Sequence, residues 1–185
     1  EFTRRFEQEA RLIAHLEHPH IVPLYDYWQD ADGAYLVMRW LPQTVRKRVQ
    51  ESPFALSAAA TLLDQVAGAL HVAHRSRVIH RDIKPDNLLL DQQDNTYLAD
   101  FGIAKVFDSG VSTTSKQLMG SIAYLAPEQI NDLELTPQSD IYSLGLVMYE
   151  ILTGVRPYAD SSASALLQHH LNDPLPSLRA HRLDL

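Results

Sequence analysis

The chain has 185 residues, 45% of them hydrophobic and 21% charged, so it can fold around a core, and intrinsic disorder is excluded. Its 23 acidic and 16 basic residues give a net charge of −7, which argues against nucleic acid as a partner. The absence of cysteine excludes disulfides, thiolate zinc sites and thiol catalysis. The most apolar stretch, Ile141–Tyr149, is too short to cross a membrane. We therefore expect a cytoplasmic protein with no membrane segment in this chain, and an anchor outside it stays open.

The first half of the chain predicts a helix, two strands and a long helix. Phe2–Leu16 has apolar residues at three- and four-residue intervals, which favours a helix. Ile21–Trp28 and Ala34–Met38 favour strands joined by a polar, glycine-containing turn. Leu56–His74 has the apolar face of an amphipathic helix, and Ser57 is its expected N-cap.

The second half predicts one short hairpin followed by helices. Leu88–Leu90 and Tyr97–Ala99 are apolar runs around a polar turn. Asp108–Gln117 is rich in hydroxyl groups, which predicts a mobile loop. Ser139–Thr153 is apolar almost all round and predicts a buried helix, and Ser162–Leu171 predicts a last helix. This order of elements indicates an α+β fold that is mostly helical.

Three short motifs stand in order along the chain: His80-Arg81-Asp82-Ile83-Lys84-Pro85-Asp86-Asn87, then Asp100-Phe101-Gly102, then Ala126-Pro127-Glu128. With these motifs the sequence resembles the eukaryotic-type protein kinase family over nearly its whole length. Lys84 is typical of its serine/threonine branch, and Gly120-Ser121 with Ala126-Pro127-Glu128-Gln129 is similar to bacterial members. The resemblance implies a mostly helical large lobe in residues 39–185. It also implies a truncated small lobe in residues 1–38, with the regulatory helix and two strands.

The motifs place polar groups that suit phosphoryl transfer, which depends on positioning and electrostatic stabilisation. Asp82 would orient the acceptor hydroxyl and take its proton, and Lys84 would place a cation near the transferred phosphate. Asn87 and Asp100 offer oxygen ligands that suit Mg²⁺. For Asp82, Asn87 or Asp100 taken alone, an ordinary turn residue near a strand end is the favoured interpretation. As a set they indicate a kinase that uses ATP and Mg²⁺.

The resemblance also implies an adenine site between the two lobes. Met38, Arg39, Trp40 and Leu41 match the segment that joins the lobes and whose backbone binds adenine. Met38 would lie behind the ring and Leu89 beneath it. For both side chains, simple core packing is an alternative interpretation.

A regulatory set follows from the same resemblance. Glu9 matches the glutamate that pairs with an ATP-holding lysine. Arg81, directly before Asp82, is the mark of kinases that are switched by phosphorylation of the activation loop, and Lys105 could add a second cation. Thr113 and Thr114 are the expected phosphorylation sites, and a homodimer would allow their autophosphorylation in trans. A loop whose hydroxyl groups are simply solvated is the alternative.

Four further side chains lead to structural expectations. Asp140 is expected to form a hydrogen bond with the backbone of the catalytic loop, which is the segment that contains Asp82. Glu128 is expected to lack a partner, because the family's arginine would lie beyond Leu185. His71 and His74 are three residues apart on a helix and could ligate a metal, but solvated or core-edge histidines are favoured.

The family has a glycine-rich phosphate loop and a lysine-bearing strand before Glu9, and both are absent from this sequence, which starts at Glu1. We therefore expect a piece of a longer kinase that phosphorylates protein serine or threonine hydroxyls, with little activity in these 185 residues alone. A non-catalytic kinase-like binding module and, more remotely, a histidine-based metal protein are the alternatives.

Overall fold

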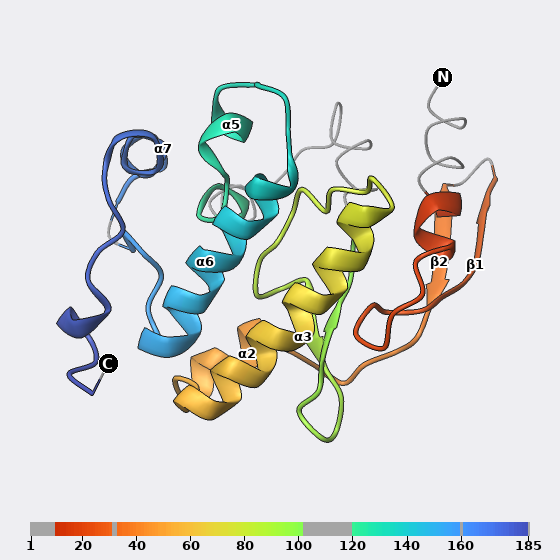
Figure 1. Cartoon of the computed structure of the whole chain (residues 1–185), viewed down its shortest axis with the longest axis horizontal. Coiled ribbons are helices and arrows are strands. Elements are labelled where there is room, and N and C mark those ends of the chain that lie inside the picture. The colour runs from red at the N-terminus through yellow and green to blue at the C-terminus, as the bar shows by residue number, and fades with distance from the viewer. Residues whose placement is uncertain (1–9, 31–32, 102–119, 160, 185) are drawn as a thin grey trace.

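The computed structural model describes all residues except 1–9, 31–32, 102–119, 160 and 185. Residues 10–14 are helical and precede the first strand. Figure 1 shows the elements that follow. In chain order these are β1 (Leu24–Gln29), β2 (Ala34–Met38), β3 (Gln43–Thr44), α2 (Val45–Glu51), α3 (Leu56–Arg75), β4 (Leu88–Leu90), β5 (Thr96–Leu98), α5 (Pro127–Ile130), α6 (Pro137–Thr153), α7 (Ala163–Asn172) and the 3-10 helix η2 (Leu178–Ala180).

The hydrophobic core lies where α3 and α6 pack side by side at the centre of the molecule (Figure 1). Leu62 and Leu70 of α3 and Leu146 and Ile151 of α6 are among its largest fully buried side chains. The α2 helix adds Val45, and α7 and η2 lie at the far end from β1 and β2 (Figure 1). This confirms the α+β class with a mostly helical body.

The strands form two small antiparallel sheets, β1-β2 and β3-β4-β5. In the first sheet Trp28 faces Tyr35, and the two rings stack with centroids 5.1 Å apart. The link between the sheets is a parallel bridge from Ile21 to Leu98, in which the amide of Val22 donates to the Leu98 carbonyl at 2.9 Å. Residues 20–22 therefore join the β1-β2 sheet to the body of the chain.

Some expected boundaries are wrong. The N-cap of α3 is Ala55 and not Ser57, because the extended backbone of Ala55 places its carbonyl to accept from Ala59 at 2.9 Å. Strand β1 begins at Leu24, since Pro23 has no amide hydrogen to continue the ladder. The helices α2 and α5 were not expected at all.

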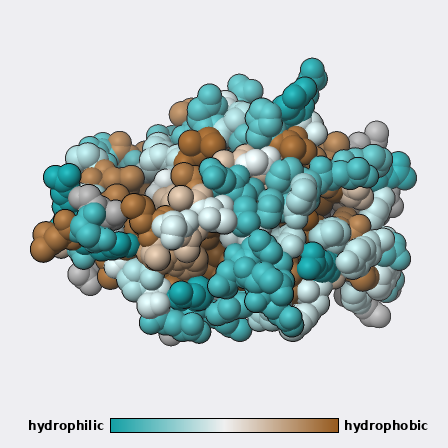
Figure 2. Space-filling model, turned by 60° about the horizontal axis from the view of Figure 1, so that its bottom comes forward, coloured by the Kyte–Doolittle hydropathy of each residue, from teal (hydrophilic) through white to brown (hydrophobic). Residues whose placement is uncertain are grey.

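The surface combines polar areas with scattered apolar side chains, and the face in Figure 2 shows brown patches among teal ones. Among the aromatic residues that the structure describes, Trp40 is the most exposed, at 79%. Among the described residues, α3 is the one helix whose length and composition would allow it to cross a membrane. Its buried residues Leu62, Val66 and Leu70 pack in the core against α6, so here it is a core helix.

Candidate active site

The segment that precedes Asp82 is anchored by a buried carboxylate on α6. Asp140 accepts a hydrogen bond from the backbone amide of His80 at 2.8 Å and from that of Arg81 at 2.9 Å. The Nε2 atom of His74 on α3 lies 2.7 Å from Asp140 Oδ2. Asp140 is 1% exposed, so these donors are needed to stabilise its buried negative charge. The expected contact between Asp140 and the catalytic loop is confirmed.

His80 is fully buried and its two ring nitrogens have different partners. Its Nδ1 accepts from the backbone amide of Asp82 at 3.3 Å, and its Nε2 donates to the carbonyl of Ala99 at 2.8 Å. Burial lowers the pKa of His80, so the neutral ring with hydrogen on Nε2 fits both bonds. The ring also packs on Phe101, with centroids 4.6 Å apart. His80 thus connects the strand end before Asp100 to the loop that holds Asp82.

Asp82, Lys84 and Asn87 come together in one cluster. Lys84 Nζ lies 2.7 Å from Asp82 Oδ2, and Asn87 Nδ2 donates to the same oxygen at 2.9 Å. Asn87 Nδ2 also donates to the Asp82 carbonyl at 2.8 Å. Lys84 Nζ reaches Ser121 Oγ at 3.4 Å. The cluster therefore joins the catalytic-loop carboxylate to a cation and to the segment around Ser121.

Asp100 is electrostatically coupled to this cluster. Desolvation raises the pKa of Asp100, while the nearby His80 and Lys84 lower it and Asp82 raises it further. Its φ of 57° lies in the left-handed region, as does the φ of 68° at Arg81. Side chains other than glycine seldom adopt this conformation, and it clusters at functional sites.

Of the expected adenine-binding residues, three share one apolar cluster. Met38, Leu41 and Leu89 pack against buried Ala99, which directly precedes Asp100. Trp40 is instead exposed to solvent. The fifth of these residues, Arg39, lies with its guanidinium 4.9 Å from the centroid of the Tyr97 ring. The structure thus brings Met38, Leu41 and Leu89 together and places the Arg39 guanidinium on Tyr97, a buried member of the same cluster, whereas the Trp40 side chain is exposed.

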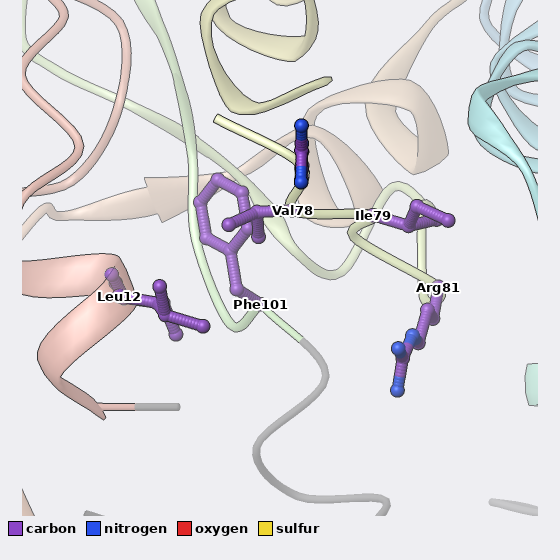
Figure 3. Close-up of a pocket in the computed structure, with 7 residues that line it drawn as sticks. Leu12, Val78, Ile79, Arg81 and Phe101 are labelled. Carbon is purple, nitrogen blue, oxygen red and sulfur yellow. The ribbon is translucent and has the colours of Figure 1, made fainter. Parts of the chain in front are cut away.

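A small pocket of about 80 Å³ lies beside Phe101. Leu12, Phe101 and Val78 gather at one side of it, and Arg81 extends away from them (Figure 3). Leu12 comes from the helical residues 10–14, so this helix lies next to Phe101. The residues that line the pocket are Leu12, Ile13, Arg77, Val78, Ile79, Arg81 and Phe101.

The expectation that Glu128 lacks a partner is wrong. Its Oε1 accepts a hydrogen bond from the hydroxyl of Ser139 at the start of α6. The neighbouring Gln129 donates from Nε2 to the carbonyl of Arg81 at 2.9 Å. The Ala126-Pro127-Glu128 motif is therefore tied to α6 and to the catalytic loop through nearby polar side chains.

A histidine metal site finds no support in the described part of the chain. His74 is bonded to Asp140, and no group of three or more metal-ligating side chains occurs among the described residues. Glu9, Lys105, Thr113 and Thr114 lie outside the described residues, as does the expected loop Asp108–Gln117.

The sequence interpretation missed Arg46. This α2 residue bonds to side chains 40, 78 and 104 positions away, which are Asp86, Tyr124 and Glu150. No local spacing pattern links residues so far apart. In the sequence Arg46 is simply one of three consecutive basic residues, with Lys47 and Arg48, and basic residues are mostly solvated surface groups.

Residues 1–182 match the family model of the protein kinase domain. The chain belongs to the protein kinase family. This confirms the protein-kinase-like fold that the three motifs predicted.

Similar proteins include bacterial serine/threonine-protein kinases. The chain is 38% identical to PrkC of Bacillus subtilis over 181 residues, which is 97% of this chain and 28% of PrkC. It is 38% identical to PknH of Mycobacterium tuberculosis over 185 residues, covering 98% of this chain and 29% of PknH. With PknA of the same species it shares 38% identity over 187 residues, covering 96% of this chain and 43% of PknA. The chain therefore spans less than half the length of these relatives.

Proposed function

We propose that the protein containing this chain is a serine/threonine protein kinase that transfers the γ-phosphate of ATP to hydroxyl groups of protein substrates. The single observation that supports this most is the cluster around Asp82. One carboxylate oxygen is contacted by Lys84 at 2.7 Å and by Asn87 at 2.9 Å, with Asp100 electrostatically coupled to both Asp82 and Lys84. The names of the similar kinases support the same activity.

In this proposal Asp82 orients the acceptor hydroxyl and accepts its proton as the oxygen attacks the γ-phosphorus. The bond from that phosphorus to the β,γ-bridging oxygen breaks, and ADP leaves. Lys84 sits between Asp82 and Ser121, where its ammonium group can stabilise charge on the transferred phosphoryl oxygens. His80 and Asp140 hold the loop in place and do not touch the substrate.

The residues present fit Mg²⁺ and ATP. Asn87 uses its amide nitrogen for Asp82, which leaves the amide oxygen as its metal-ligating atom. Asp100 supplies a carboxylate whose pKa is raised by desolvation. Both donors are hard oxygens, which Mg²⁺ prefers. When bound, the metal would neutralise charge on the ATP phosphates.

The remaining site assignments belong to the same proposal. The apolar cluster of Met38, Leu41 and Leu89 would hold adenine, with the backbone of residues 38–41 as its polar partner. Phosphorylation at Thr113 or Thr114 and its recognition by Arg81 and Lys105 stay predictions, as do the pairing role of Glu9, a homodimer for trans-autophosphorylation and a cytoplasmic location.

The test is phosphate transfer from radiolabelled ATP to a protein substrate by the full-length protein. We expect Asp82→Asn to lower kcat by about a thousandfold or more, because removing a catalytic base typically costs 10²–10⁴-fold. The matched control is Asp64→Asn, an exposed aspartate on α3, which should keep wild-type activity. Near wild-type turnover of Asp82→Asn would contradict the assignment of the base.

A further inference from the structure

Arg46 connects three separate parts of the molecule through one guanidinium group. Its Nε donates to Asp86 Oδ2 at 3.2 Å, its Nη1 to Glu150 of α6, and its Nη2 to the hydroxyl of Tyr124 at 2.5 Å. The Tyr124 hydroxyl in turn donates to the second oxygen of Glu150. Each nitrogen of the guanidinium therefore has its own partner, which a planar fork with fixed geometry permits.

The network is largely removed from solvent. Glu150 is 4% and Tyr124 3% exposed, and the side chain of Arg46 is 18% exposed. Burial, and after it the carboxylate of Glu150, raise the pKa of Tyr124, so the phenol keeps the proton that it donates. Burial of a carboxylate at this depth is tolerable only when cationic and polar donors pair with it, and Arg46 and Tyr124 do so here.

Arg46 contacts the catalytic loop through its backbone as well. Its amide donates to the carbonyl of Pro85 at 3.0 Å, directly after Lys84. Lys84 itself reaches Ser121, and the amide of Tyr124 donates to the Ser121 carbonyl at 3.3 Å. The turn at residues 121–124 is thus held on one side by Lys84 and on the other by Arg46.

We propose that Arg46 is a positioning residue for phosphoryl transfer. It fixes the distance between the catalytic loop and the turn at residues 121–124, so that the substrate hydroxyl can reach Asp82. This inference rests on the proposed function. Near-attack geometry is sensitive to displacements of about 1 Å, which can cost about 100-fold in rate. A residue that spaces these two segments therefore affects kcat without contacting substrate.

The first test uses Arg46→Lys in the full-length protein, with Lys47→Met as the matched control. Lysine keeps the charge but cannot bond three partners in three directions. We expect kcat for a protein substrate to fall by about 10- to 100-fold, with the KM for ATP unchanged. Lys47 lies next to Arg46 on α2 with an exposed side chain, and its variant should match the wild type.

Two further variants separate positioning from simple stabilisation. Tyr124→Phe removes one hydroxyl and keeps the Arg46–Glu150 pair, so it should fold normally and still lose about 10-fold in kcat. Arg46→Met with Glu150→Met replaces the ion pair by apolar side chains, which is often neutral for stability. We expect this double variant to unfold at about the wild-type temperature and yet to stay slow.

The results of these experiments separate a positioning role of Arg46 from a purely structural one and from failure of the proposed function. Folded variants that keep the wild-type kcat would overturn the positioning role. A double variant that regains stability and activity together would also overturn it, because Arg46 would then serve the fold alone. A wild-type protein that transfers no phosphate would overturn the proposed function itself, and with it this inference.

Discussion

Asp100 lowers the stability of the fold at the candidate active site. Its backbone lies in the left-handed region at φ 57°, and desolvation raises the pKa of its carboxyl. A raised pKa means that folding favours the protonated form. The contribution to stability is therefore fully present below the usual pKa of the carboxyl and is lost as the pH rises through the folded-state value. At neutral pH the charge opposes folding until a cation binds.

Replacing Asp100 by asparagine should therefore stabilise the metal-free protein. At neutral pH in EDTA, we expect the full-length Asp100→Asn variant to unfold about 2 °C above the wild type, since asparagine also tolerates positive φ. Near pH 3 the two proteins should unfold at similar temperatures. Mg²⁺ with ATP should raise the Tm of the wild type and leave that of the variant nearly unchanged. A variant that is less stable than the wild type at neutral pH contradicts this account.

The two glycines of α6 have opposite surroundings. Gly154 ends the helix at φ 79°, and a Cβ built there would meet the Pro53 ring at 3.0 Å. Gly145 lies inside the helix with nothing within 4 Å of its Cβ position. The end of α6 and the approach of Pro53 therefore both require glycine at position 154, while the glycine at position 145 is only a weak helix former.

We expect Gly154→Ala to lower the free energy of unfolding by about 1–2 kcal/mol, because of both the strained φ and the contact with Pro53. Gly145→Ala should raise it by about 0.5–1 kcal/mol, because alanine loses less entropy in a helix. Denaturant unfolding of both variants measures this. If the unfolding midpoint of Gly154→Ala equalled that of the wild type, the helix end would not depend on Gly154.

Sequence patterns predicted well what depends on neighbours along the chain. The apolar periodicity located α3, α6 and α7, and the motif around Asp82 predicted the contact of Asp140 with the loop. The N-cap of α3 was missed because the helix begins after Ala55 without a side-chain cap, so no serine marks its start. The short α2 was missed because its burial depends on α6 and β4, far away in sequence.

The candidate active site shows the same difference between contacts local in sequence and contacts between distant residues. The grouping of Asp82, Lys84 and Asn87 needs only one loop, so its spacing in the sequence was enough. Arg46 joins α2, the catalytic loop and α6 over as many as 104 positions, and only the folded chain brings these together. Glu128 was expected to depend on a distant arginine, whereas Ser139 at the start of α6 satisfies it.

Residues are unevenly buried across the molecule. On β1 and β2 every residue is half-buried or exposed, and the sheet joins the rest through the short bridge between Ile21 and Leu98. On α6, by contrast, most residues are buried, including Leu146 and Val147 with no exposed surface. Local opening is easiest where few apolar contacts must break.

Hydrogen exchange of the full-length protein should reflect this difference. We expect amides in the middle of α6 to exchange at least about 100-fold more slowly than those of β1 and β2, because opening α6 exposes the core that it shares with α3. Mg²⁺ with ATP should slow exchange at residues 38–41, where the proposed adenine site meets β2, and leave η2 unchanged. The amides of η2 are therefore the internal control. Protection in β1 equal to that in α6 would mean that the two sheets and the helices open as one cooperative unit.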